Sequence, residues 1–341
     1  MKILLIKLGA LGDVLRTTPL LTAYKAKYPD CRITWLVDEA HADILKDNPK
    51  IERVVPRTTE GLNRLKKESF DLALNLDKEP EALDAVFEVS AAKKMGFGRK
   101  PDGALIPLDS SSDYAYRLGI DDELKFRTNQ KTYQQISFEQ AGLNFGGEEY
   151  VYSLPGESIS FAKKHLKNLG FDALSAKRPV IGINTGSGTR FAGKRLPVRT
   201  LARLAEIFQE RSGATVFLLG GPDEIARNLE IKNLTGRPVI NTGSHTISRF
   251  AAIVQECDLI ISGDTTAMHI AIAVKVPVLA YFASTCSAEI ELYGRGQKIV
   301  SGIECAPCYK KNCPIDEQCM KDMDAETLFQ AARASLRLKE A

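Results

Sequence analysis

No apolar run in the 341-residue sequence approaches the ~20 residues that a membrane-spanning helix requires, so no such helix is expected. Charge of one sign is also scarce, because 46 Lys and Arg face 43 Asp and Glu, for a formal net charge of +3. That surplus is too small to indicate a nucleic-acid partner. It allows a modest basic patch, which could meet acidic substrates or make peripheral contact with a membrane surface.

An export signal is missing as well. Lys2 and Lys7 flank the first apolar run, which leads directly into a patterned fold. We therefore expect a cytoplasmic protein. Of the seven cysteines, four lie within residues 305–319, and in a chain without an export signal this argues against a disulfide framework.

Those four cysteines could hold a structural zinc ion or an iron–sulfur cluster. Their spacing, with two, four and five intervening residues, matches no standard signature closely, and packed free thiols are the alternative. The candidate ligands are Cys305, Cys308, Cys313 and Cys319.

Short apolar runs alternate with helical stretches in both halves of the chain, which predicts parallel sheets with right-handed crossovers. The second half restarts the pattern after residue 170. We therefore expect an α/β protein with two Rossmann-like domains, residues 1–170 and 171–324, followed by a terminal helix at 325–341. Residues 109–127 are predicted to be polar and irregular. The predicted strands are 3–7, 32–37, 53–55, 70–76, 94–97, 180–184, 214–219, 239–240, 259–262 and 276–282.

The first predicted strand runs into a glycine turn, Gly9 to Gly12, and then into Asp13. The glycine spacing is not that of the dinucleotide fingerprint G-x-G-x-x-G. Asp13 can be an N-terminal helix cap, which the helix dipole favours, or a general base at the carboxyl end of a parallel strand. The local pattern leaves both interpretations open.

The second half carries three loops suited to a phosphorylated ligand. The loop at residues 185–190 is rich in glycine and hydroxyls and is followed by Lys194, although the P-loop pattern is absent. Glu224 follows a buried strand, where a carboxylate can bind ribose hydroxyls or favour a helix start. The stretch 262–269 precedes an alanine-rich helix whose backbone N–H groups would suit a diphosphate.

Taken together, these stretches resemble glycosyltransferase family 9, the ADP-heptose:lipopolysaccharide heptosyltransferases. They follow the family's order and span nearly the whole chain. The matching stretches are KLGALGDVLRTTPLL at 7–21, NTGSGTRFAGKRLP at 184–197, LLGGPDE at 218–224, GDTTAMHIAIAVKVPVLAYF at 263–282 and CAPCYKKNCPIDEQCM at 305–320.

The resemblance implies a GT-B fold of two facing domains, with the terminal helix crossing back to the first domain. It also implies an inverting, metal-independent transfer of a sugar to a lipopolysaccharide core or similar glycolipid acceptor. In this family the sugar is heptose and the donor is ADP-heptose. The resemblance implies that no cofactor is required. It also implies a cytoplasmic enzyme, which as a peripheral membrane protein would lie on the inner face of the inner membrane.

The resemblance assigns roles residue by residue. Asp13 becomes the catalytic base and Lys194 the cation beside the donor phosphates. The expected nucleotide-sugar site consists of Thr185, Gly186, Ser187, Glu224, Asp264, Thr265, Thr266 and His269, and the expected acceptor side of Gly12, Arg16 and Thr17. Thr266 departs from the family, which usually has glycine there.

Two rival interpretations remain. One is another two-domain sugar-nucleotide enzyme, such as an epimerase, which would need no glycolipid acceptor. The other is a non-enzymatic metal- or redox-sensing binding protein that works through residues 305–319.

Overall fold

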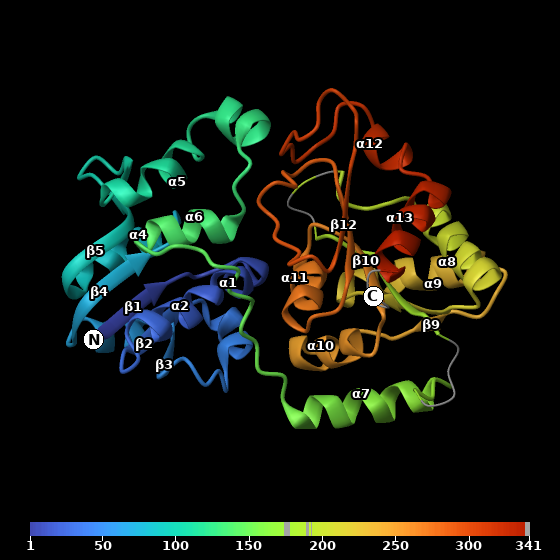
Figure 1. Ribbon diagram of the computed structural model, residues 1–341, viewed down its shortest axis with the longest axis horizontal. Coiled ribbons are helices and arrows are strands. Elements are labelled where there is room, and N and C mark those ends of the chain that lie inside the picture. Colours follow the sequence, from blue (N-terminus) through green and yellow to red (C-terminus); the bar gives the residue numbers. More distant parts are fainter. Residues whose placement is uncertain (174–177, 189–190, 192, 338–341) are drawn as a thin grey trace. The chain divides into compact units, whose positions relative to one another are not determined.

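The computed structural model describes residues 1–173, 178–188, 191 and 193–337, and the chain divides into two compact units. The first unit comprises Met1–Ser153 and Ala288–Glu291, and the second comprises Leu154–Ser287 and Leu292–Ala341. This division falls earlier than the predicted boundary after residue 170. The reason is that α7 (Gly156–Asn168) packs against α10 (Ile247–Gln255) of the second unit (Figure 1).

The sheet of the first unit has the strand order β3-β2-β1-β4-β5-β6 and is parallel except for the antiparallel pair β5–β6. Its central strand is buried from Ile3 to Ile6, as the short apolar run predicts for a strand covered on both faces. The strands are β1 (Lys2–Ile6), β2 (Arg32–Val37), β3 (Arg53–Pro56), β4 (Ser69–Asn75), β5 (Ser90–Arg99) and β6 (Leu105–Pro107).

Short helices connect these strands. Pro19 begins a new helix because proline fits the first turn, where its missing N–H needs no partner. The segment 109–127, predicted to be irregular, in fact contains short helical turns that are too brief and polar to show a period. The helices are α1 (Leu11–Thr17), α2 (Pro19–Lys27), α3 (Thr59–Leu65), α4 (Pro80–Glu88), α5 (Asp113–Arg117) and α6 (Tyr133–Gln140), with 3-10 helices at Glu39–Leu45 and Ser110–Ser112 and a π-helical turn at Leu124–Thr128.

The sheet of the second unit has the strand order β12-β11-β10-β7-β8-β9, with parallel pairing throughout. The carboxyl ends of β7, β8 and β10 therefore lie at one edge, where ligands bind in such sheets. The strands are β7 (Val180–Asn184), β8 (Thr215–Leu219), β9 (Ile240–Asn241), β10 (Leu259–Gly263), β11 (Val278–Phe282) and β12 (Gly296–Val300).

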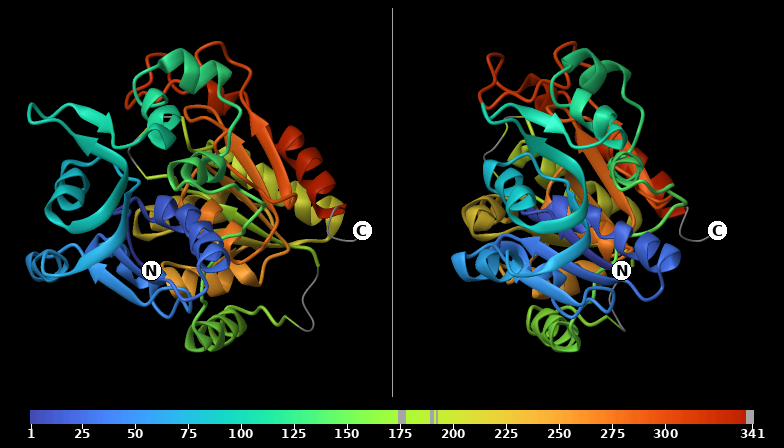
Figure 2. Two further views of the ribbon diagram at one scale, coloured as in Figure 1. Left: turned by 60° about the vertical axis from the view of Figure 1, so that its left-hand side comes forward. Right: turned by 90° about the vertical axis from the view of Figure 1, so that its left-hand side faces the viewer.

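Helices cover both faces of this second sheet (Figure 2). Leu201, Leu204 and Phe208 are fully buried, as their helical spacing predicts, and the Phe208 and Phe329 rings pack edge to face at 5.0 Å. Besides α7 and α10, the helices are α8 (Val198–Ser212), α9 (Ile225–Leu234), α11 (Thr266–Ala273), α12 (Gln318–Lys321) and α13 (Ala325–Arg337), with a 3-10 turn at Pro222–Glu224.

The terminal helix α13 packs on α8 and on strands β10, β11 and β12, so its described part belongs to the second unit. Figures 1 and 2 show α13 lying beside α8. The apolar side of α13, with Leu328, Phe329 and Ala332, is buried in the core of the second unit. That the terminal helix also packs on the first domain stays a prediction. Among the described residues, no helix is long and apolar enough to cross a membrane.

Candidate active site

Asp13 lies in the first turn of α1, directly beyond the carboxyl end of β1. Its Oδ2 atom accepts a hydrogen bond from the backbone N–H of Ala10 at 3.3 Å, which satisfies one of the free donors at the helix start. The side chain is nevertheless 29% exposed, so its carboxylate can be reached from solvent. The Asp13 carboxylate therefore stabilises the start of α1 and is still accessible to a substrate.

Two cations flank the Asp13 carboxylate. The Arg16 guanidinium lies 2.8 Å from Oδ1, and the Lys7 ammonium lies 4.0 Å from Oδ2. Lys7 also pairs at 3.2 Å with Asp77, whose carboxylate accepts the backbone N–H of Leu8 at 3.0 Å. Neighbouring cations favour the ionised form of a carboxylate, which is the form that can accept a proton.

The two cations stay charged although both are mostly buried. Burial opposes the charged form of Lys7, but Tyr133, Asp13 and Asp77 outweigh it and raise the pKa of the ammonium. Burial likewise opposes the charged form of Arg16, whose pKa is nevertheless raised by Asp13 and Glu289. Positive charge therefore persists beside Asp13 throughout the physiological pH range.

The other acceptor-side residues expected from the sequence have structural contacts. Gly12 is buried within α1. The Thr17 hydroxyl donates to the backbone oxygen of Asp13 at 2.7 Å and lies 2.8 Å from the Tyr133 hydroxyl, which joins α1 to α6. Of the three, Arg16 contacts the carboxylate of Asp13 directly.

In the second unit, Asn184 at the end of β7 connects the loops at the carboxyl edge of the sheet. Its side-chain amide donates to the backbone oxygen of Gly186 at 2.8 Å and lies 3.2 Å from the Ser262 hydroxyl and 3.3 Å from the Thr265 hydroxyl. Thr265 is the residue before α11, yet its hydroxyl makes no capping bond to that helix. The first backbone N–H groups of α11 are thus left to other partners, and such groups bind anions well.

Lys194, Asp264 and His269 form a group at the start of α11. The Lys194 ammonium lies 3.4 Å from Asp264 Oδ2, and His269 Nε2 lies 3.9 Å from Asp264 Oδ1. Lys194 and Asp264 are partly exposed, at 14% and 21%, whereas His269 is nearly buried. The structure therefore brings together three residues that the sequence predicted to act together.

Glu224 lies over two glycines of the neighbouring loops. Its Oε2 atom accepts the backbone N–H of Gly221 at 2.9 Å. A Cβ atom at Gly186 would lie 1.9 Å from Glu224 Oε1, so a larger residue there would displace this carboxylate. Glycine at position 186 therefore allows the Glu224 side chain, from the turn after β8, to lie against the loop after β7.

The remaining residues predicted for the nucleotide-sugar site lie outside the group formed by Lys194, Asp264 and His269. The Thr185 hydroxyl is fully buried and bonds to the Leu219 carbonyl and the Asn228 side chain, so it secures the loop. The Ser187 hydroxyl donates to the Gly188 carbonyl at 3.4 Å, and Thr266 begins α11 half-buried. Residues 189 and 190 of the predicted phosphate loop lie outside the described residues.

The cysteine segment does not form a metal site in the part of the chain that the structure describes. No three His, Cys, Asp or Glu side chains there are grouped so that they could hold a metal ion. Cys319 is buried, Cys308 and Cys313 are half-buried and Cys305 is exposed, all as free thiols. Burial and the neighbouring thiols raise the pKa of Cys319 to about 11, which keeps it protonated and unreactive.

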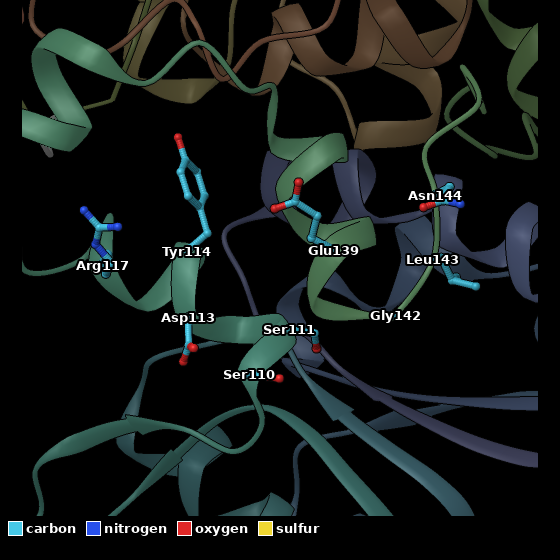
Figure 3. Close-up of a pocket in the computed structure, with 9 residues that line it drawn as sticks. All are labelled: Ser110, Ser111, Asp113, Tyr114, Arg117, Glu139, Gly142, Leu143 and Asn144. Atoms are coloured by element: carbon cyan, nitrogen blue, oxygen red, sulfur yellow. The ribbon is translucent and has the colours of Figure 1, made fainter.

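A separate open pocket lies on the first unit between α5 and α6 (Figure 3). Asp113, Tyr114 and Arg117 of α5 line it, and the carboxylate of Glu139 on α6 extends toward Tyr114. Lys131 pairs with Glu139 and lies 4.0 Å above the Tyr114 ring. The pocket includes none of the residues predicted for catalysis or donor binding.

Several residues of the Asp13 group were not singled out from the sequence. Asp77 follows an apolar strand directly, which is a signal that sequence reasoning could have used. Tyr133 gives no comparable signal, and Glu289 reaches Arg16 from a distant part of the chain.

Comparison with known proteins gives a consistent picture. The profile of glycosyltransferase family 9 (heptosyltransferase) matches residues 61–318. The chain is 28% identical over 336 residues to lipopolysaccharide heptosyltransferase 1 of Pseudomonas aeruginosa, covering 92% of this chain and 87% of that protein.

Solved structures agree in fold. A family 9 glycosyltransferase from Veillonella parvula superposes with a TM-score of 0.76 at 20% identity, covering 98% of this chain and 97% of that one. The E. coli heptosyltransferase WaaC with ADP superposes with a TM-score of 0.64 at 17% identity and 99% coverage of both chains. At these identities the likeness establishes the fold, which is the GT-B fold.

Proposed function

Because the chain belongs to glycosyltransferase family 9, we propose that it transfers heptose from ADP-heptose to a lipopolysaccharide core or a similar glycolipid acceptor. The sugar and the acceptor class follow from the names of the relatives, which are heptosyltransferases of lipopolysaccharide. The observation that carries the proposal is the position of the Asp13 carboxylate, which lies between two cations and is 29% exposed. A glycosyl transfer needs such a base for the acceptor hydroxyl.

In the proposed reaction the acceptor hydroxyl gives its proton to Asp13 while its oxygen attacks the anomeric carbon. The bond from that carbon to the diphosphate oxygen breaks, ADP departs and the configuration inverts. Arg16 and Lys7 fix the carboxylate in place and balance its charge before the proton arrives.

The donor is assigned to the carboxyl edge of the second sheet. The N-terminal amides of α11 and the Lys194 ammonium bind the diphosphate and stabilise the charge that develops on departing ADP. Asp264 holds Lys194 at that position, with His269 beside it. Glu224 accepts hydrogen bonds from the ribose hydroxyls.

The pocket beside α5 and α6 is a candidate for acceptor selection. It lies on the unit that carries Asp13, and its Arg117 and Glu139 offer charges of both signs to a polar sugar. This assignment rests on the proposed division of labour between the two units.

A donor screen with mass detection tests the function. Purified protein is incubated with ADP-heptose, other nucleotide sugars and glycolipid from the source organism. The proposal predicts a mass gain of one heptose on the glycolipid, with ADP released only when the acceptor is present. Conversion of the nucleotide sugar to an isomer, without acceptor and without release of ADP, would favour an epimerase-type enzyme instead.

A further inference from the structure

Glu289 belongs to a short excursion of the chain. Residues Ala288–Glu291 are part of the first unit, although the chain on either side of them belongs to the second. The excursion lies in the connection between β11 and β12. Its backbone is held by the N–H of Tyr133, which donates to the Glu289 carbonyl at 2.9 Å.

The Glu289 side chain shares a cation with Asp13. Arg16 places Nη2 2.8 Å from Asp13 Oδ1 and Nη1 3.7 Å from Glu289 Oε2. The guanidinium also lies 3.9 Å above the Tyr133 ring, which fixes its plane. Arg16 and Glu289 are only 16% and 19% exposed, so water screens these charges incompletely.

We infer that Glu289 is a positioning residue that adjusts the basicity of Asp13 through Arg16, an inference that rests on the proposed role of Asp13 as the base. A cation beside a carboxylate favours its ionised form and makes it a weaker proton acceptor. Glu289 balances part of the Arg16 charge and so offsets this weakening. Because the excursion follows β11, the base in one unit is adjusted by a residue carried on a connection of the other unit's sheet.

Other charged or titratable groups lie around Asp13, Arg16 and Glu289, and substitution of Glu289 leaves these groups in the chain. They come from the ends of β1 and β4, from α6 and from the segment after it. These groups are Lys7, Asp77, Lys78, Tyr133 and Tyr150.

The test is the pH profile of transfer in Glu289→Gln. Removing the negative charge leaves the full Arg16 charge acting on Asp13, so the acid limb of kcat should move to lower pH by roughly 0.5–1 unit, the size expected for two partly exposed charges joined by one guanidinium. The plateau rate should fall because the base is weaker. Glu289→Asp keeps the negative charge and should therefore show a smaller shift than Glu289→Gln. Glu291→Gln, which removes the same charge two residues away, is the matched control.

A double-mutant cycle separates the route through Arg16 from a general structural effect. In an Arg16→Gln background, Glu289→Gln should move the acid limb by less than about a third of its effect in the natural chain. An equal shift in both backgrounds would overturn the route through Arg16. A uniform loss of rate at every pH, with no shift, would show a structural role only.

A second readout does not depend on transfer. The side-chain carboxyl carbon of Asp13 can be titrated by NMR in protein labelled at aspartate, and its signal is assigned as the one lost in Asp13→Asn. The midpoint should move to lower pH in Glu289→Gln and stay in place in Glu291→Gln. An unchanged midpoint overturns the inference, whereas absence of any transfer by the natural protein overturns only the proposed function.

Discussion

The close approach of Glu224 to Gly186 gives a sharp prediction about nucleotide binding. In Gly186→Ala, the new methyl group would lie 1.9 Å from Oε1, 2.0 Å from Cδ and 2.4 Å from Cγ of Glu224. Non-bonded heavy atoms prefer about 3.5–4 Å, so the whole carboxyl end must swing away. It then leaves the Gly221 N–H, which it now accepts at 2.9 Å.

The expected loss of ADP binding free energy follows from the hydrogen bonds that Glu224 is proposed to make with the ribose. A hydrogen bond to a charged group contributes about 1.5–3 kcal/mol, so losing one such bond should weaken ADP binding by roughly 10- to 150-fold. Isothermal titration calorimetry with ADP measures this directly. Glu224→Ala should show a similar loss, and the double variant should be little worse than either single one.

Gly302→Ala is the matched control, because a Cβ atom there meets nothing within 4 Å and the glycine has no special backbone angle. It should bind ADP as the natural protein does. If Gly186→Ala retained ADP affinity within about twofold while Glu224→Ala lost it, the steric argument would be refuted. If both retained it, Glu224 would have no role in ribose binding.

Two further predictions concern the second unit. Lys194→Ala should raise the donor KM and lower kcat, because the variant loses the cation that Asp264 holds beside the proposed diphosphate site. Steady-state kinetics with varied donor measures both, and unchanged values would show that Lys194 has no part in donor binding or transfer. Burial, opposed by a hydrogen bond with the Thr242 carbonyl, lowers the pKa of His245 in the folded chain, with His165 and Arg249 adding to the effect. The unfolded state therefore binds more protons, so stability should fall as pH drops below about 6.5, and Tm measured at pH 7.5 and 5.5 should depend less on pH in His245→Gln.

Much of the fold could be predicted because it depends on local patterns. The apolar runs at 32–37 and 180–184 match β2 and β7 residue for residue, and the spacing of Leu201, Leu204 and Phe208 identified the buried face of α8. Short polar helices such as α5 were not predicted, because five residues are too few to show a helical period.

The candidate site was predicted only in part, for a similar reason. Loop motifs at strand ends pointed correctly to the grouping of Lys194, Asp264 and His269, since parallel strands bring their carboxyl ends to one edge. Glu289 could not be predicted, because its contact with Arg16 depends on a four-residue excursion whose sequence carries no motif. Such contacts depend on the path of the chain in the tertiary structure, which a local sequence pattern does not reveal.

The same limit applies to the cysteine segment. Four thiols within fifteen residues could hold a metal or pack as free thiols, because spacing alone does not fix where the sulfur atoms point. In the described residues they do not converge with other ligands.

The role of Asp13 as the base of a glycosyl transfer can be measured by single-turnover transfer in Asp13→Asn. The substitution keeps the shape of the side chain but removes its capacity to accept a proton, so the rate should fall by roughly 10²–10⁴-fold. ADP affinity should remain within about twofold of the natural protein, because the donor is assigned to the other unit. A transfer rate in Asp13→Asn comparable to that of the natural protein would show that Asp13 is not the base.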